Sequence, residues 1–69
     1  MRYELYIDYL WSDDTTCYRT ETYDTEMRAS HRQREIVEHG LSIADAVDKS
    51  FTIIPAHRVL AVKRREVAG

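Results

Sequence analysis

The segment at residues 51–66, FTIIPAHRVLAVKRRE, constrains the fold more than any other part of the chain. It holds the densest run of apolar residues, and its two halves resemble strands separated by Pro55. Proline lacks the N–H donor of a strand ladder, so it predicts a sheet edge, a bulge or a break at this point. Apolar residues fall on both faces, which predicts a strand that is covered on both sides.

Two explanations for this doubly apolar segment stay open. It is a central strand with one face closed by a short helix and loops, or its second face, or the edge near Pro55, contacts another chain. A chain of 69 residues lies near the lower limit for a domain held together by one hydrophobic core. Self-association or partner binding would therefore add stability, and we expect more apolar surface along this segment than the helical cover can hide.

Composition narrows the class of protein. An apolar fraction of 43% with two glycines and one proline excludes a mostly disordered chain. The single cysteine, Cys17, excludes an intramolecular disulfide and fits a reducing compartment. The N-terminal stretch MRYELYIDYL lacks a signal-peptide pattern, and no apolar run reaches the roughly 18 residues of a membrane span. We expect one cytoplasmic domain over residues 1–69, with no membrane partner.

Alternation of polar and apolar residues at positions 2–11 predicts a β-strand with one buried face. The segment SDDT favours a turn, and residues 15–23 form a second β-rich stretch. If Asp13 and Asp14 are the two central turn residues, the hairpin pairs Tyr9 with Tyr18 and Asp8 with Arg19. The predicted inward face of the first strand consists of Tyr3, Leu5, Ile7, Tyr9 and Trp11.

The pattern at residues 25–39 predicts the main helix. Asp24 or Thr25 can cap its start, and Gly40 ends it. The expected inward stripe is thin for a helix that must cover a sheet. It consists of Ala29, Gln33, Ile36, Val37 and Met27.

Residues 42–50 have two interpretations. A short helix would use Ser42 as its cap and Asp45 at the reciprocal capping position. A strand would use the alternation of Leu41, Ile43, Asp45 and Val47, followed by a turn at DKS. We favour the short helix because alanine and aspartate are poor strand formers. With two further strands at 51–55 and 58–66, the sequence predicts an α+β fold with a small antiparallel sheet and one main helix packed on it.

The sequence contains no pattern that identifies a reaction. Cys17 and the three histidines lack the spacings of familiar metal sites. Asp13 and Asp14 are typical turn formers, and the chain has no glycine-rich phosphate loop. We therefore expect a protein that is not an enzyme and needs no metal or cofactor.

Two kinds of binding surface remain as hypotheses. The chain is rich in Tyr and has one Trp, and such aromatic residues are common interface anchors. The candidate protein-binding residues are Tyr6, Leu10, Ile54, His57, Arg58 and Leu60. The alternative is a nucleic-acid interface, although acidic residues alternate with the helix arginines and the net charge is −2. Its candidate residues are Arg28, Arg32, Lys63, Arg64 and Arg65.

The layout of an N-terminal hairpin, a charged helix and a late strand of the type IIPAHRVLAV resembles small accessory proteins of phages and mobile elements. The resemblance covers most of the chain and assigns no functional residue. It implies a regulator or inhibitor that binds a bacterial host protein, including components of defence systems. We therefore expect a non-catalytic protein-binding module, with a homodimer as one arrangement and nucleic-acid binding as the alternative function.

Overall fold

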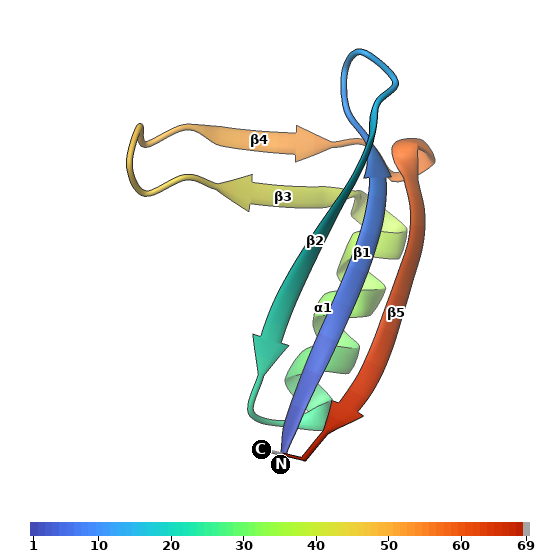
Figure 1. Ribbon diagram of the computed structural model, residues 1–69, viewed down its shortest axis with the longest axis vertical. Coiled ribbons are helices and arrows are strands. Elements are labelled where there is room, and N and C mark those ends of the chain that lie inside the picture. Colours follow the sequence, from blue (N-terminus) through green and yellow to red (C-terminus); the bar gives the residue numbers. More distant parts are fainter. Residues whose placement is uncertain (69) are drawn as a thin grey trace.

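The computed structural model describes residues 1–68 and has an α+β architecture, as the sequence predicts (Figure 1). An antiparallel sheet of order β2–β1–β5 carries helix α1 on one face, and a separate hairpin of β3 and β4 projects to one side. We call this hairpin, residues 41–54, the arm. The elements are β1 (Arg2–Leu10), β2 (Thr16–Tyr23), α1 (Glu26–His39), β3 (Leu41–Ala44), β4 (Phe51–Ile54), the 3₁₀ turn η1 (Ala56–Arg58) and β5 (Val59–Val67).

Strand β1 lies at the centre of the main sheet. Its alternation buries Leu5, Ile7 and Tyr9 against α1, which confirms the predicted inward face at these three positions. Tyr3 is only half-buried. Trp11 lies beyond the end of β1 and is exposed, so its predicted inward position is wrong. Strand β5 pairs with β1 alone and forms an edge of the sheet. The central-strand explanation of the C-terminal segment is therefore wrong, because the two strand-like halves around Pro55 separate into different sheets.

The β1–β2 hairpin has a different register from the predicted one. Its loop contains three residues between Trp11 and Thr15, and the Trp11 N–H donates to the Thr15 carbonyl at 2.9 Å. Asp14 adopts a left-handed conformation with φ 65°, as the last residue of such loops commonly does. Tyr9 consequently pairs with Cys17, and the predicted two-residue turn is wrong by one position.

Helix α1 covers the sheet with little apolar surface. Thr25 caps it, because its side chain accepts the N–H of Arg28 at 3.2 Å. Within α1 only Ala29 and Ile36 are buried, so the expected thin stripe is confirmed. Two of its expected members do not belong to it, since Val37 and Met27 are exposed. The end of the helix at Gly40 is also confirmed.

The favoured short helix at residues 42–50 is wrong. The strand interpretation is correct for residues 41–44, whereas residues 45–50 form a turn. Leu41 pairs with Ile54 and Ala44 with Phe51, which makes an antiparallel ladder. The Asp45 carboxylate accepts the Val47 N–H at 2.8 Å and so builds a turn instead of capping a helix. Long-range pairing with an apolar strand outweighs the low strand propensity of this segment.

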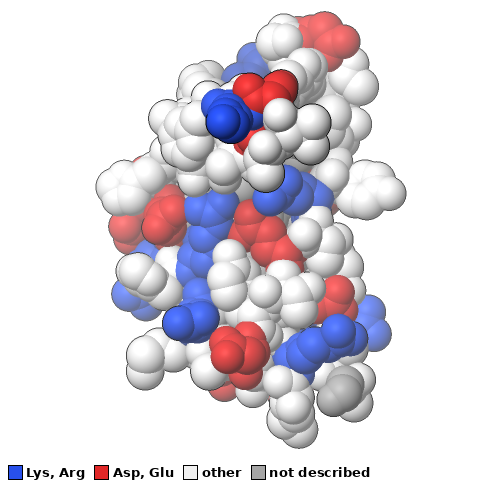
Figure 2. All heavy atoms as spheres, turned by 90° about the vertical axis from the view of Figure 1, so that its left-hand side faces the viewer, with Lys and Arg blue, Asp and Glu red and all other residues white. Residues whose placement is uncertain are grey.

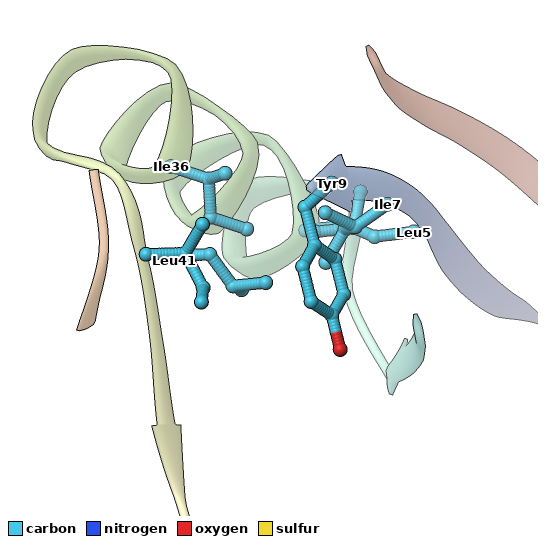
Figure 3. Packing of buried hydrophobic residues seen from close by; sticks show 7 residues of the cluster. Leu5, Ile7, Tyr9, Ile36 and Leu41 are labelled. Atoms are coloured by element: carbon cyan, nitrogen blue, oxygen red, sulfur yellow. The ribbon is translucent and has the colours of Figure 1, made fainter. Parts of the chain in front are cut away.

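The hydrophobic core lies between the sheet, α1 and the first residues of the arm. Figure 3 shows Leu5, Ile7 and Tyr9 of β1 facing Ile36 of α1 and Leu41 of β3. Burial of a large aliphatic side chain contributes about 1.5–3 kcal/mol. The base of the arm is therefore part of the core and is held firmly to the body of the protein.

Gly40 is required where α1 turns into β3. Its φ is +92°, and a Cβ atom at this position would lie 2.3 Å from the Ile54 carbonyl oxygen. We expect Gly40→Ala to lower the free energy of unfolding by more than about 1 kcal/mol, because both the backbone conformation and the close contact oppose it. Urea denaturation measures this change. Glu38→Ala, at an exposed position of the same helix, is the control, and an equal effect of both variants would contradict the assignment.

Candidate functional site

The arm is a projection whose tip and base are both held by contacts within the chain. At its tip the Asp45 N–H donates to the Ser50 carbonyl at 2.9 Å, and the Ser50 N–H donates to the Asp48 carboxylate at 2.9 Å. Lys49 takes the left-handed conformation that closes the turn, with φ 58°. These local bonds fix the tip, and the buried pair Leu41 and Ile54 fixes the base.

Apolar side chains on the arm are left uncovered. Phe51 and Ile53 share one face of β4 and keep 65% and 59% of their surface exposed. Ile53 also lines a groove of about 210 Å³ at the base of the arm, together with Leu10, Trp11 and Pro55. Trp11 is exposed as well. We call the set of Trp11, Phe51 and Ile53 the arm patch.

Arg58 lines the groove and holds the β1–β2 loop next to it. Its Nη2 donates to the Trp11 carbonyl and, at 2.8 Å, to the Asp14 carboxylate, and its Nε donates to the Leu10 carbonyl at 3.4 Å. One guanidinium thus ties η1 to the β1–β2 loop. Because Trp11 lies in this loop, the arm patch is held in a defined position relative to the sheet.

A polar network joins the arm to the main sheet on the other side. Arg32 of α1 donates to both carboxylate oxygens of Glu21, at 2.9 and 3.1 Å, and to the Ser42 carbonyl at 2.9 Å. The Tyr23 hydroxyl donates to the same carboxylate at 2.9 Å, and Arg19 donates to it at 3.2 Å. The Glu21 side chain is only 10% exposed, so this charge is stabilised almost entirely by protein groups.

The network shifts the titration of its members. Burial opposes ionisation of Glu21, but the hydrogen bonds from Arg32, Tyr23 and Arg19 outweigh it and lower the pKa of the carboxyl. Burial and the bond to Glu21 raise the pKa of the Tyr23 phenol. The bond to Glu21 raises the pKa of Arg32. At neutral pH these shifts keep Glu21 ionised, Tyr23 neutral and Arg32 charged. The network therefore stabilises the fold and contains no group poised to exchange a proton.

The predicted protein-binding residues fall in several places. Leu10 lines the groove beside the arm patch, while His57 and Leu60 are exposed near β5. Tyr6 lies on the sheet face opposite α1. Ile54 is buried in the core, so it does not belong to a surface, and the Arg58 side chain braces the β1–β2 loop.

The apolar C-terminal segment is only partly covered within one chain. Ile54 is buried and Val59 and Val62 are half-buried, whereas Ile53 and Leu60 are more than half exposed. Leu60 lines a shallow groove with Val37 of α1. The expectation of surplus apolar surface is confirmed for these two positions.

The predicted nucleic-acid residues do not form one site. Arg32 belongs to the buried Glu21 network. Arg64 donates through Nη1 to the Ser30 hydroxyl, and its Nη2 lies 3.8 Å from Oε1 of Glu26. Arg28 lies 3.9 Å from Asp24 at the helix start. Lys63 and Arg65 remain exposed on the sheet face opposite α1. On the side toward which the arm points, cations and carboxylates alternate and no field of one sign appears (Figure 2).

Sequence reasoning missed both the arm patch and the Glu21 network. In the sequence the exposed Phe51 and Ile53 look like core residues, because only the pairing of β3 with β4 moves them away from the sheet. The sequence contained a weak signal of the Glu21 network. Glu21 alternates with Cys17 and Tyr23 on the inward face of β2, where a carboxylate needs a cationic partner.

Residues 1–68 contain no group of three or more histidine, cysteine, aspartate or glutamate side chains that could bind a metal ion. In the same residues no helix has the length and apolar character needed to cross a bilayer.

Comparison with known proteins gave no match to a family model, a curated protein or a solved structure.

The Glu21 network predicts a specific pH dependence of stability. We expect Glu21→Gln to lower the free energy of unfolding by about 1.5–3 kcal/mol at pH 7, since it removes charge-assisted hydrogen bonds. The folded state lowers the pKa of Glu21 below its ordinary value of 4.5. Its contribution is therefore present above that pH and is lost as the pH falls through the lowered pKa.

Thermal unfolding of both proteins between pH 7 and pH 2 tests this prediction. The difference in Tm between wild type and Glu21→Gln should shrink as the pH falls below about 4.5 and vanish in strong acid. Glu38→Gln, an exposed change on α1, should alter Tm little at any pH. A Glu21→Gln difference that stays constant across this range would contradict the role of the ionised carboxylate.

Proposed function

We propose that this chain is a non-catalytic protein-binding module and that its partner docks on the arm patch. The observation that carries the proposal is the exposure of Phe51 and Ile53 on a projection whose tip and base are both fixed. A small domain gains nothing in its own core from apolar side chains held in water. Such residues on a well-ordered element are typical of sites for other proteins.

The fixed tip and base of the arm are a second argument for binding, in addition to the exposure of its apolar side chains. A surface that is already ordered loses little conformational entropy on association. Phe51 and Trp11 are aromatic, and aromatic side chains are common centres of binding energy at interfaces. Thr52, Ser12 and the arm-tip carboxylates of Asp45 and Asp48 provide polar groups around the apolar centre. This arrangement fits a partner with a complementary apolar ridge or pocket.

The resemblance to accessory proteins of phages and mobile elements suggests a bacterial host protein as the partner. In this proposal the chain acts in the cytoplasm as a regulator or inhibitor, since occupancy of a partner surface requires no catalytic group. A second copy of the chain is the other partner that the arm patch would fit, which would make the protein a homodimer.

Paired serine substitutions on the arm test this function. We expect Phe51→Ser together with Ile53→Ser to reduce recovery of the partner from bacterial lysate by more than about tenfold, because anchor residues commonly contribute 2 kcal/mol or more each. Affinity capture with quantitative mass spectrometry measures the recovery. Met27→Ser is the control, since Met27 is 82% exposed on α1, away from the arm.

Sedimentation velocity separates the two kinds of partner. A wild-type dimer that becomes monomeric in the double serine variant would identify a second copy as the partner. A monomeric wild type that captures one specific protein would identify a different chain. If the double variant recovers the same proteins as wild type and sediments identically, the arm patch is not a binding surface.

A further inference from the structure

Among residues 1–68, no other element covers the face of the main sheet opposite α1. Leu5, Ile7 and Tyr9 of β1 point toward α1, so the alternate residues of β1 point away from it. We call this side of the sheet the open face (Figure 1). The strand register places three rows of side chains on it: Thr22, Glu4 and Arg65; Thr20, Tyr6 and Lys63; and Tyr18, Asp8 and Ala61.

The chemistry of the open face differs from that of the arm patch. Its exposed side chains are mainly threonines, tyrosines and charged groups, with Leu10 as the single large aliphatic residue in the β1 segment. Tyr18 is 82% exposed, and Tyr6 is half-buried on the central strand. This composition offers little apolar area for a protein partner. It does offer flat aromatic rings beside cations and hydroxyl groups.

The two tyrosines lie close enough to act together. Tyr6 lies directly opposite Thr20. Tyr18 precedes Thr20 by two residues in β2 and lies on the same face. Such diagonal neighbours lie about 7–8 Å apart, within reach of aromatic side chains. Adjacent bases of a single strand can therefore contact both rings, and base–aromatic stacking does not depend on which base is present.

Two cations of the open face lie on the β5 side of the tyrosines, whereas Arg2 lies at the start of β1. Lys63 pairs with Tyr6 in the β1–β5 register, and Arg65 follows two residues later, so both point to the open face from the edge strand β5. Two residues along a strand span about 7 Å. A phosphate backbone that follows β5 would meet both cations while its bases turn toward β1 and β2.

We propose that the open face binds single-stranded nucleic acid, with Lys63 and Arg65 contacting phosphates and with Tyr6 and Tyr18 stacking on bases. This site is independent of the arm patch and uses only two of the five basic residues that the sequence suggested. Single strands fit better than a duplex, because the bases of a duplex are paired and stacked and cannot reach the rings.

The two carboxylates of the open face fit this arrangement. Glu4 accepts the Tyr6 hydroxyl at 3.2 Å and lies opposite Arg65, so its charge is balanced by near neighbours. Asp8 lies between Tyr18 and Ala61, as a diagonal neighbour of Lys63. Carboxylates accept hydrogen bonds from base amino groups, whereas they repel phosphates. The phosphates are thus directed to β5 and the bases to β1 and β2.

Fluorescence anisotropy with the full chain tests the proposal. The probes are a fluorescein-labelled ten-nucleotide RNA of mixed sequence, the same sequence as DNA, and the RNA duplex. We expect the single strands to bind more tightly than the duplex at 50 mM salt. For two phosphate contacts, the slope of log K against log salt should be about −1.4, at roughly −0.7 per contact. The stronger of the RNA and DNA probes identifies the preferred sugar.

Two variants separate the contribution of the phosphate contacts from that of base stacking. Lys63→Glu together with Arg65→Glu should weaken binding by more than about tenfold and bring the salt slope close to zero. Tyr18→Ala should weaken binding about tenfold and leave the slope unchanged, because stacking releases no counterions. Tyr18 is exposed, so its loss should not disturb the fold.

Matched controls exclude general effects of charge and of exposed apolar side chains. Arg34→Glu together with Lys49→Glu changes net charge equally at exposed positions away from the open face, and Met27→Ala removes an exposed apolar side chain of α1. Both should bind the probes as wild type does. The proposal is wrong if wild type binds no single strand at 50 mM salt, if the duplex binds equally well, or if the control pair loses as much affinity as the Lys63 and Arg65 pair.

Discussion

The thin apolar stripe of α1 limits how the hydrophobic core of this protein can be closed. Only Ala29 and Ile36 of this helix are buried, so the helix cannot cover the inward face of β1 without help. Leu41 and Ile54 complete the core from the base of the arm. The chain therefore uses the first pair of its second hairpin for packing and leaves the remaining length outside the core.

The projection of the arm follows from this division. Its base is held by apolar contacts and by Arg32, which joins Glu21 of the sheet to Ser42 of the arm. A buried carboxylate is costly without partners, and Glu21 receives bonds from three side chains. Arg58 fixes the neighbouring β1–β2 loop from the opposite side. Local bonds and two guanidinium groups thus hold an element that contributes little area to the core.

The same arrangement leaves two surfaces with different chemistry. Phe51 and Ile53 give the arm an apolar character, which suits a protein partner. The open face of the sheet has tyrosines and cations and little aliphatic surface, which suits single-stranded nucleic acid. The two surfaces share no residue, so the two proposed activities are independent. A small binding protein with both would be able to act where a nucleic acid and a protein meet.

The sequence by itself determined the elements whose signal is local. The alternation of residues 2–11, the cap at Asp24 or Thr25 and the stop at Gly40 each depend on near neighbours, and the α+β class followed from them. Tertiary structure decided the rest. The loop conformation at Asp14 set the hairpin register, the pairing of Leu41 with Ile54 made a strand of a helix-like segment, and the break at Pro55 moved β4 out of the main sheet. These three features depend on contacts between residues distant in sequence or on a single backbone angle. Such contacts and angles leave no periodic pattern in the amino-acid sequence.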